Sequence, residues 1–415
     1  MPLKYIVIVG DGMADYPLEQ FGNKTALQYA VTPNFDLLAG KGTLGLVQTI
    51  PESLPPGSDV ANLSLMGYDP LRYYSGRSPF EAASIGVDLH PEDVSFRCNL
   101  VTLSADEPYE EKILIDYSSG DIATEEAKEL IEAVNSYFKS TAISFYTGLR
   151  YRHLMVWEGT SDDWKLTPPH DISGRKIKDY LPAGQDSFLV KLMMEQSYRF
   201  LSQHSVNLER VKKGLKPANS IWLWGNGRKP LLPLFFEKYG LAGSIIADVD
   251  LMKGIGLIAG LELIEVENLT GDINTLYAAK ARAALDILAR GQDFVYIHIE
   301  EPDECSHRFE TDNKVKAIEL IDQLVVKTIK EEMDASGFDY SMMLLTDHAT
   351  PLSLGTHTRE PVPFVIYRSS DIKDKSTQKY DEVSAFETGV LVEDGSTLLG
   401  HFLGADEYAS LLDDK

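Results

Sequence analysis

The chain has 415 residues, of which 44% are hydrophobic and 25% charged, a composition typical of a globular protein with two or three domains and ample core. Its formal net charge of −24 at pH 7 argues against binding to nucleic acids or to anionic membranes. No apolar run is long enough for a membrane span or a signal sequence, and Cys98 and Cys305 lie far apart, so we expect a cytoplasmic protein with reduced thiols.

The first predicted element is a buried strand over residues 5–9, a β-branched run that stops at Gly10, Asp11 and Gly12. In open parallel α/β sheets, ligands bind just beyond the carboxyl ends of the strands, which is where Asp11 stands. Asp11 is therefore a candidate metal ligand. A simple turn aspartate between two glycines explains this residue equally well.

A serine follows at the start of the next clear helix. Two prolines and a glycine at residues 55–57 end one element, and Ser58 opens a predicted helix that runs to Met66. One interpretation of Ser58 is an ordinary N-cap. The other is a nucleophile, because a helix N-terminus stabilises a phosphate or an alkoxide and a bound metal would lower the pKa of the hydroxyl. Asp59 is either a general acid or base, or a charge that complements the helix N-terminus.

The middle of the chain has strand-like patterns over residues 142–146 and 152–157, and a helical pattern over residues 188–201. On a continuous strand, Arg150 and Arg152 would share one face and form a clamp for a carboxylate or a phosphate. A solvated edge strand is the competing interpretation of these two residues.

Strand and helix patterns alternate from residue 220 onward, as in a βαβ core, with helices expected over residues 278–289 and 314–329. Asp11 and Ser58 stand near the N-terminus, and the other candidate metal ligands, described next, lie beyond residue 300. A site assembled from both ends of the chain predicts an α/β core domain that is interrupted by an insertion. The predicted boundaries are residues 1–100 and 216–415 for the core and residues 101–215 for the insertion.

The next candidates follow an apolar run over residues 294–299, which predicts a buried strand. Asp303 and His307 are four residues apart, so one helical turn would place both on the same face as a chelating pair. His298 lies inside the apolar run, and we expect a hydrogen-bonded core residue there rather than a ligand. Three carboxylates nearby are either adjacent to the site or simply solvated: Glu300, Glu301 and Glu304.

The last candidates follow a second apolar run over residues 341–346. Asp347 and His348 stand at its end, and His357 comes in the polar loop after it. A helix-capping role for His348 and a solvated His357 are the alternatives. Taken together, the carboxylates, imidazoles and serine hydroxyl suit two divalent metal ions, with Zn²⁺ or Mn²⁺ favoured and Co²⁺ or Mg²⁺ as alternatives.

Several of these motifs resemble one known family. The stretches that carry the resemblance cover residues 8–13, 57–62, 76–79, 96–100, 303–307 and 346–348. They resemble the alkaline phosphatase superfamily and, within it, the archaeal-type cofactor-independent phosphoglycerate mutases. The resemblance implies an alkaline-phosphatase-like core, a mostly parallel sheet sandwiched by helices, with an inserted smaller α+β cap domain that binds substrate.

The resemblance also implies a distribution of the ligands. One metal ion would be held by Asp303, His307 and His357, and the other by Asp11, Asp347, His348 and the nucleophile Ser58. Bacterial relatives carry a histidine where this chain has Asn62, so the resemblance assigns no role to that residue.

The activity implied is the interconversion of 3-phosphoglycerate and 2-phosphoglycerate through a phosphoserine, without 2,3-bisphosphoglycerate. A closing cap would exclude water and retain the glycerate between the two transfers. In the family a lysine corresponding to Lys253 reaches the phosphate. The predicted substrate-binding residues are Arg77, Arg97, Arg150, Arg152, Arg228 and Lys253.

Two other activities share these ligands and this nucleophile. The chain also resembles a bacterial branch proposed as a homoserine kinase of threonine synthesis, and a phosphatase of the same superfamily would need the same metals. The sequence has no Gly-x-x-x-x-Gly-Lys-Ser/Thr loop, which removes the usual nucleotide cradle of a kinase. A non-enzymatic binding module would leave so many metal-type ligands unexplained. The sequence does not determine the oligomeric state.

Overall fold

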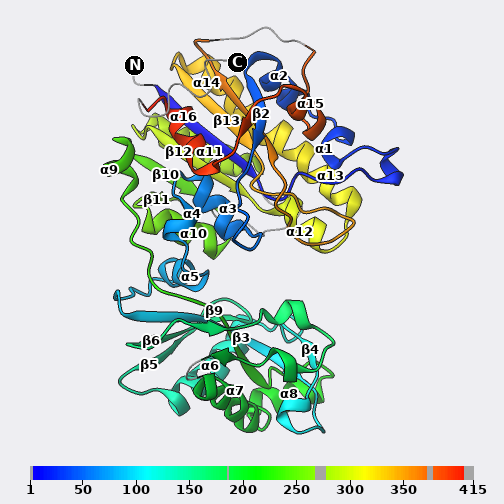
Figure 1. Cartoon of the computed structure of the whole chain (residues 1–415), viewed down its shortest axis with the longest axis vertical. Coiled ribbons are helices and arrows are strands. Elements are labelled where there is room, and N and C mark those ends of the chain that lie inside the picture. The colour runs from blue at the N-terminus through cyan, green and yellow to red at the C-terminus, as the bar shows by residue number, and fades with distance from the viewer. Residues whose placement is uncertain (1–2, 185–186, 267–276, 372–376, 406–415) are drawn as a thin grey trace. The chain divides into compact units, whose positions relative to one another are not determined.

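The computed structural model describes residues 3–184, 187–266, 277–371 and 377–405 (Figure 1). The chain divides into two compact units. The core unit comprises Met1–Tyr74 and Leu231–Lys415, and the inserted unit comprises Ser75–Pro230. The prediction of a core interrupted by one insertion therefore agrees with the way the chain divides.

The predicted boundaries of the insertion, residues 101–215, are too narrow at both ends. Strands β3 (Asp93–Leu103) and β9 (Ser220–Gly227) were assigned to the core, but they pair antiparallel with one another inside the inserted unit. The local pattern of a buried strand is the same in either sheet, so the sequence alone did not show which sheet each strand joins.

The core unit is built on one eight-stranded sheet in the order β11-β10-β12-β1-β13-β14-β2-β15. Only β14 runs antiparallel to its neighbours, and the other pairings are parallel. The strands are β1 (Lys4–Gly10), β2 (Thr43–Val47), β10 (Gly243–Ile246), β11 (Glu262–Leu263), β12 (Phe294–Ile299), β13 (Tyr340–Leu345), β14 (Val362–Arg368) and β15 (Leu391–Val392). The predicted strands at 5–9, 294–299 and 341–346 are thus confirmed.

Helices cover both faces of this sheet (Figure 1). Because side chains alternate along a strand, Ile6 and Ile8 of β1 point into an apolar cluster with α2 (Pro33–Lys41), α11 (Tyr277–Ala289), α13 (Thr311–Leu320) and α14 (Lys327–Ser336). On the other face, Tyr5 packs edge-on against Phe402 of α16 (Gly395–Leu403), which contacts α3 (Ser58–Leu65). Helix α10 (Asp250–Ile258) packs beside α3 on the same face.

The remaining helical segments of the core unit are short. They are η1 (Glu19–Phe21), α1 (Ala26–Tyr29), α4 (Pro70–Tyr73), α9 (Phe235–Tyr239), α12 (Glu301–His307), α15 (Glu382–Glu387) and a π-helical turn over Ile321–Val326. The π turn interrupts the helix predicted over residues 314–329. It places the buried Asp322 carboxylate at the start of α2, where it accepts bonds from the backbone N–H groups of Asn34 and Phe35, each at 2.8 Å.

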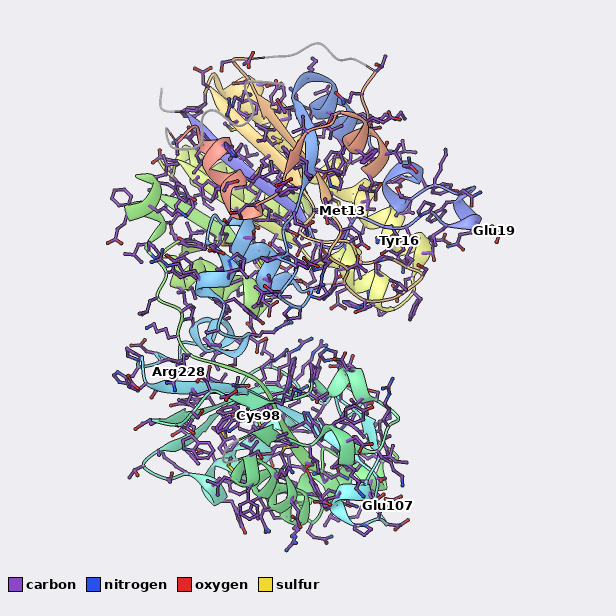
Figure 2. All side chains as sticks on the ribbon, in the orientation of Figure 1. Met13, Tyr16, Glu19, Cys98, Glu107 and Arg228 are labelled. Atoms are coloured by element: carbon purple, nitrogen blue, oxygen red, sulfur yellow. The ribbon has the colours of Figure 1, made fainter. Side chains whose placement is uncertain are left out.

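The inserted unit is a separate α+β structure (Figure 1). Its five-stranded antiparallel sheet runs β4-β3-β6-β5, and β9 pairs with β3. One face carries Phe96 and Cys98, the latter labelled in Figure 2, and packs against α6 and α7. The other elements, with these two helices, are β4 (Leu114–Asp116), β5 (Ile143–Tyr146), β6 (Arg152–Glu158), β7 (Trp164–Lys165), β8 (Ala183–Gly184), α5 (Ser78–Ser84), α6 (Thr124–Phe138), α7 (Ser187–Leu201), α8 (Ser205–Lys212) and the short turns Tyr109–Glu111, Pro169–Ile172 and Ile177–Tyr180.

The two ends of the inserted unit lie against each other. The hydroxyl of Ser75 donates a hydrogen bond to the carbonyl of Arg228. Gly76 has a φ of 130°, and a Cβ there would lie 2.0 Å from the carbonyl oxygen of Asn226. A residue with a side chain would not fit, so this close backbone approach requires glycine at position 76.

No helix within the described residues is long and apolar enough to cross a membrane.

Candidate metal centre

The central strands of the core sheet bring the predicted aspartates together. Strand β1 lies between β12 and β13 and is parallel to both, so the three carboxyl ends share one edge of the sheet. Asp11 directly follows β1, Asp347 follows β13, and Asp303 lies on α12 just after β12. All three carboxylates are buried, and together they define the candidate site.

One group of ligands, the Asp303 triad, consists of Asp303, His307 and His357. The Nε2 atom of His307 lies 3.0 Å from Asp303 Oδ2, and His357 Nε2 lies 3.4 Å from Asp303 Oδ1. The two Nε2 atoms are 3.0 Å apart. Ligands that share one divalent ion at about 2.1 Å stand at about this mutual distance, so the triad fits a metal site. The other ring nitrogen of His307 contacts the carbonyl of Gly355 at 2.9 Å, which orients the ring.

The second group, the Ser58 group, consists of Ser58, Asp11, Asp347 and His348. The Nε2 atom of His348 lies 3.0 Å from Ser58 Oγ, 3.5 Å from Asp11 Oδ1 and 3.4 Å from Asp347 Oδ2. Asp11 Oδ1 is buried and accepts no hydrogen bond from the described residues. A buried carboxylate oxygen in that position suits a divalent cation.

The electrostatics of the site also favour cations. Burial first, and then the charge of Asp347, raise the pKa of Asp11 well above its usual value, and burial likewise raises the pKa of Asp347. Burial alone would raise the pKa of Asp303 too, but His357 and His307 outweigh it and hold that pKa well below its usual range. The protein thus concentrates carboxylates and imidazoles, which are metal ligands once deprotonated, at one sheet edge.

Ser58 is the first residue of α3 and not its N-cap. Gly57 takes the N-cap position, and no side chain caps this helix. The N-cap interpretation of Ser58 is therefore wrong, and its hydroxyl is directed instead toward His348 and Asp11, which lies 3.5 Å away through Oδ2.

Asp59 is fixed beside the serine. Its Oδ1 accepts a bond from the backbone N–H of Val60 at 2.9 Å, and its Oδ2 accepts one from the hydroxyl of Tyr74 at 2.7 Å.

Sequence reasoning missed two residues that link the ligands. Thr350 is buried, and its hydroxyl donates to Asp303 Oδ1 at 2.6 Å and lies 3.2 Å from His348 Nδ1, so it joins the Asp303 triad to the Ser58 group. Gly12, with a φ of 62°, donates its N–H to Asp347 Oδ1 at 3.1 Å. A Cβ at Gly12 would lie 2.6 Å from the Thr350 hydroxyl, so the Gly-Asp-Gly turn was a usable signal for this contact.

Asn62, which had no assigned role, positions a ligand. One helical turn after Ser58, its Nδ2 donates to Asp347 Oδ2 at 2.8 Å and to the carbonyl of Ser58 at 2.9 Å. Its Oδ1 accepts a bond from the Tyr296 hydroxyl at 2.7 Å. Such contacts hold a metal ligand in one orientation.

His298 and the glutamates that follow it differ in burial and in their contacts. His298 is buried in β12 as predicted, but the predicted hydrogen bond is absent, because neither ring nitrogen makes one among the described residues. Its Nε2 atom lies 3.2 Å from Asp11 Oδ2. Glu301 is buried, whereas Glu304 is partly exposed and pairs with Arg308 at 2.7 Å. Glu304 thus lies at the surface in an ion pair, which favours the second of the two interpretations.

Three of the predicted substrate-binding arginines gather in the inserted unit. Arg77 and Arg97 share the carboxylate of Glu81 at 3.0 and 2.8 Å, and Arg97 lies over the ring of Trp224, 4.4 Å from its centroid. Burial, followed by neighbours that include Arg77 and Arg152, lowers the pKa of Arg97 to about 10. This is a concentrated positive site suited to an anion.

The clamp predicted from Arg150 and Arg152 is wrong in its geometry. Strand β6 begins at Arg152, and Arg150 lies in the turn before it with a φ of 53°. The Arg150 guanidinium binds Asp121 at 2.7 Å. The two arginines therefore do not share a strand face.

The other two predicted residues are also engaged in local contacts. Arg228, labelled in Figure 2, donates to the Asp162 carboxylate at 3.1 Å and to the carbonyls of Glu92 and Thr160 at 2.9 and 2.7 Å, contacts that give it a structural role. Lys253 lies on α10 of the core unit and pairs with Glu265 at 3.2 Å.

Comparison with known proteins places this site in context. A family model described as 2,3-bisphosphoglycerate-independent phosphoglycerate mutase matches residues 39–207. The protein of that name from Methanosarcina barkeri is 45% identical over 399 residues, 96% of this chain and 98% of the relative.

Two solved structures resemble this one over nearly the whole chain. The PH0037 protein from Pyrococcus horikoshii has a TM-score of 0.79 and 27% identity, and 97% of each chain is covered. A cofactor-independent phosphoglycerate mutase from Thermoplasma acidophilum has a TM-score of 0.63 and 26% identity, and covers 97% of this chain and 99% of its own.

The Asn62→Leu substitution tests the positioning of Asp347. Losing the Nδ2 contact should lower Mn²⁺ affinity by about 10- to 100-fold, the usual effect of removing a partner of a metal ligand. Isothermal titration of metal-free protein with Mn²⁺ measures this change. Asn313→Leu, at an exposed asparagine whose amide bonds only Glu310 in the described residues, serves as the control and should titrate like the unmodified protein.

Metal binding should also release protons. Burial lowers the pKa of His307, but its bond to Asp303 and the charge of that carboxylate outweigh burial and raise the pKa to about 9. In the metal-free protein His307 is therefore protonated at pH 7.5, and it must lose that proton to bind a cation. Titration with Mn²⁺ in buffers of different ionisation enthalpy should show His307→Gln releasing about one proton fewer. Equal proton release by both proteins would contradict this assignment.

Proposed function

The chain belongs to the family of 2,3-bisphosphoglycerate-independent phosphoglycerate mutases, and from this premise we propose that it interconverts 3-phosphoglycerate and 2-phosphoglycerate at Ser58. One observation carries the proposal. The Ser58 hydroxyl stands at the start of a helix, 3.0 Å from a histidine of one ligand group, and Thr350 links that group to a second one. A serine in that position has the surroundings of a nucleophile for phosphoryl transfer.

We propose that two divalent ions bind here, Mn²⁺ or Zn²⁺ in the first place and Co²⁺ or Mg²⁺ as alternatives. Asp303, His307 and His357 would hold one ion, and the Ser58 group would hold the other. When bound, the ions neutralise charge on the transferring phosphoryl group and lower the pKa of the serine hydroxyl. The orphaned Oδ1 of Asp11 supports this assignment.

The chemistry assigned to the residues consists of two transfers. Ser58 Oγ gives up its proton and attacks the phosphorus of 3-phosphoglycerate, the bond from phosphorus to the 3-oxygen breaks, and that oxygen takes a proton. The 2-hydroxyl of the glycerate then loses its proton and attacks the phosphoserine, the bond from phosphorus to Ser58 Oγ breaks, and Ser58 Oγ takes a proton back. One proton is given to the glycerate and one is taken back, so a single group can serve both steps.

Asp59 is the candidate for that proton exchange. It follows Ser58 in the first turn of α3, and its carboxylate is held by Tyr74 and by the backbone of Val60. The backbone N–H groups at the start of α3 would stabilise the phosphoryl oxygens during both transfers.

The substrate carboxylate is assigned to the arginines. Arg77, Arg97 and Arg152 form the densest group of basic side chains among the predicted contacts, and guanidinium groups bind carboxylates through paired hydrogen bonds. We assign Lys253 to the phosphate, which requires its ion pair with Glu265 to open. Arg150 and Arg228 have weaker support, because each pairs with a carboxylate of its own, Asp121 and Asp162, whereas Arg77 and Arg97 share one.

The kinase alternative has less support. The relatives that match over nearly the whole chain are named as mutases, and the sequence has no P-loop to hold a nucleotide.

Ser58→Ala tests the nucleophile. Mn²⁺-loaded protein should convert 3-phosphoglycerate to 2-phosphoglycerate without added 2,3-bisphosphoglycerate, as followed by phosphorus NMR. Loss of the attacking oxygen should slow conversion by about 10⁴-fold or more. Ser53→Ala, at an exposed serine of the core unit, is the matched control and should convert normally.

The products distinguish the alternatives. Accumulation of inorganic phosphate alone would identify a phosphatase of the same superfamily. An unchanged substrate would rule out the mutase, and homoserine with phosphoryl donors would then be the next assay.

Arg152→Met tests the carboxylate contact. Removing one charge-assisted bond should raise the KM for 3-phosphoglycerate by about 10- to 100-fold, with a smaller effect on kcat. Steady-state kinetics against Arg199→Met, an arginine of α7 that pairs with Glu195, provides the control. An unchanged KM in Arg152→Met would remove this residue from the substrate site.

A further inference from the structure

A buried ion pair adjoins the two ligand groups and takes no part in the chemistry assigned so far. Lys314 of α13 and Asp15, in the loop after β1, meet at 2.9 Å between Nζ and Oδ2, and both side chains are fully buried. Removing two charges from water is costly, and well-packed apolar side chains often fill such a place with no loss of stability. The pair therefore requires an explanation other than the stability of the core.

The lysine connects the two loops that carry the Ser58 group's aspartates and histidine. Besides Asp15, its ammonium donates to the carbonyl of Thr350 at 2.9 Å and to the carbonyl of Ala14 at 3.4 Å, so all three N–H bonds are used. Ala14 lies three residues after Asp11, and Thr350 lies two residues after His348. One side chain thus joins the loop after β1 to the loop after β13.

Asp15 reinforces the same connection. Its Oδ1 accepts a bond from the backbone N–H of Leu352 at 3.1 Å, and its own N–H donates to Glu382 of α15 at 3.0 Å. The N–H of Thr350 donates in turn to the carbonyl of Ala14 at 3.2 Å. The backbone at Thr350 is therefore held from several directions by buried groups.

The residue held in this way is the one that joins the two ligand groups. The Thr350 hydroxyl donates to Asp303 Oδ1 at 2.6 Å and lies 3.2 Å from His348 Nδ1. Asp303 would hold one ion and His348 the other. A shift of the Thr350 backbone would therefore disturb a ligand of each ion at once.

The charge of the lysine alone would not favour a cation here. Burial lowers the pKa of Lys314, and the charges of Asp15 and Asp303 oppose that effect. An ammonium that interacts with Asp303 would weaken the binding of a divalent ion to that carboxylate, and Asp15 compensates for its charge. The hydrogen bonds of the lysine, and not its charge, thus account for its place beside the ligands.

We propose that Lys314 is a positioning residue of the metal centre, whose bond to the Thr350 carbonyl fixes the Thr350 hydroxyl between Asp303 and His348, and that Asp15 cancels its charge. The pair sets the positions of both ligand groups before an ion binds. The inference rests on the proposed function only in that Asp303 and His348 are taken as metal ligands.

Two substitutions made together test this role without changing the net charge. Asp15→Asn combined with Lys314→Met removes one charge of each sign, and the amide oxygen of asparagine can still accept the N–H of Leu352. We expect the affinity of the metal-free protein for Mn²⁺, measured by isothermal titration, to fall by about 10-fold, at the lower end of the loss usual for partners of metal ligands. An unchanged affinity would overturn the proposal.

A second buried lysine of the core unit provides the matched control. Lys4 lies at the start of β1, the end of that strand away from the ligands, and its Nζ is 3.5 Å from Asp293 Oδ1. Lys4→Met combined with Asp293→Asn also keeps the net charge and should leave the Mn²⁺ affinity unchanged, while thermal unfolding reports the stability of both double variants. An equal loss of affinity in this control would show that general destabilisation weakens metal binding, and would overturn the proposal.

Thr350→Val tests the route of the effect, because valine keeps the shape of threonine and removes the hydroxyl. This substitution alone should weaken Mn²⁺ binding, and an unchanged affinity would overturn the proposal however the ion-pair variant folds. Adding Asp15→Asn and Lys314→Met to it should weaken binding by only about twofold more, since both changes act on one contact. A further 10-fold loss would show that Lys314 does not act through Thr350.

The unmodified protein separates this inference from the proposed function. If it binds no Mn²⁺, the metal centre itself is rejected, and the positioning role with it. If the unmodified protein and the variant with Asp15→Asn and Lys314→Met bind Mn²⁺ equally well, only the positioning role is rejected.

Discussion

Mutual repulsion among three buried carboxylates is the constraint on which the rest of the core unit depends. Asp11, Asp303 and Asp347 are brought together because β1 lies between β12 and β13 and the three strands point the same way. Burial and like charge make this arrangement unfavourable for a fold without cations. Divalent ions bound by these carboxylates together with histidines and a serine would offset the repulsion at this edge of the sheet.

The residues around the candidate ligands hold these side chains in defined positions. Thr350 contacts a candidate ligand from each of the two groups, and Asn62 connects Asp347 to the backbone of Ser58. Gly12 allows the turn to approach Asp303 and Thr350 closely. Each of these contacts is short and made by a buried group, so the ligand positions are largely set before any ion binds.

The sequence predicted the elements with strong local patterns and left long-range contacts undetermined. The strands that precede Asp11, Asp303 and Asp347 were recognised from their apolar runs, and parallel-sheet geometry then placed the ligands. The limits of the insertion were missed because a buried strand does not reveal its partner. Thr350 was missed, and Asn62 had no assigned role, because their roles come from hydrogen bonds to residues remote in the sequence. The positive φ of Arg150 was not predicted, because position 150 carries neither glycine nor asparagine, the residues that most often adopt this conformation.

The two ends of the inserted unit lie against each other, and this closeness bears on whether another domain could replace the unit. Since Ser75 and Gly76 lie against Arg228 and Asn226, the chain leaves the core and returns to it through a gap that a tight turn could span. Closing a short flexible loop there would cost less chain entropy than closing a long one, because the cost of loop closure grows with loop length. The core sheet is thus open to exchange of the whole inserted unit for another domain with adjacent termini, which would leave the candidate metal ligands of the core unit in place.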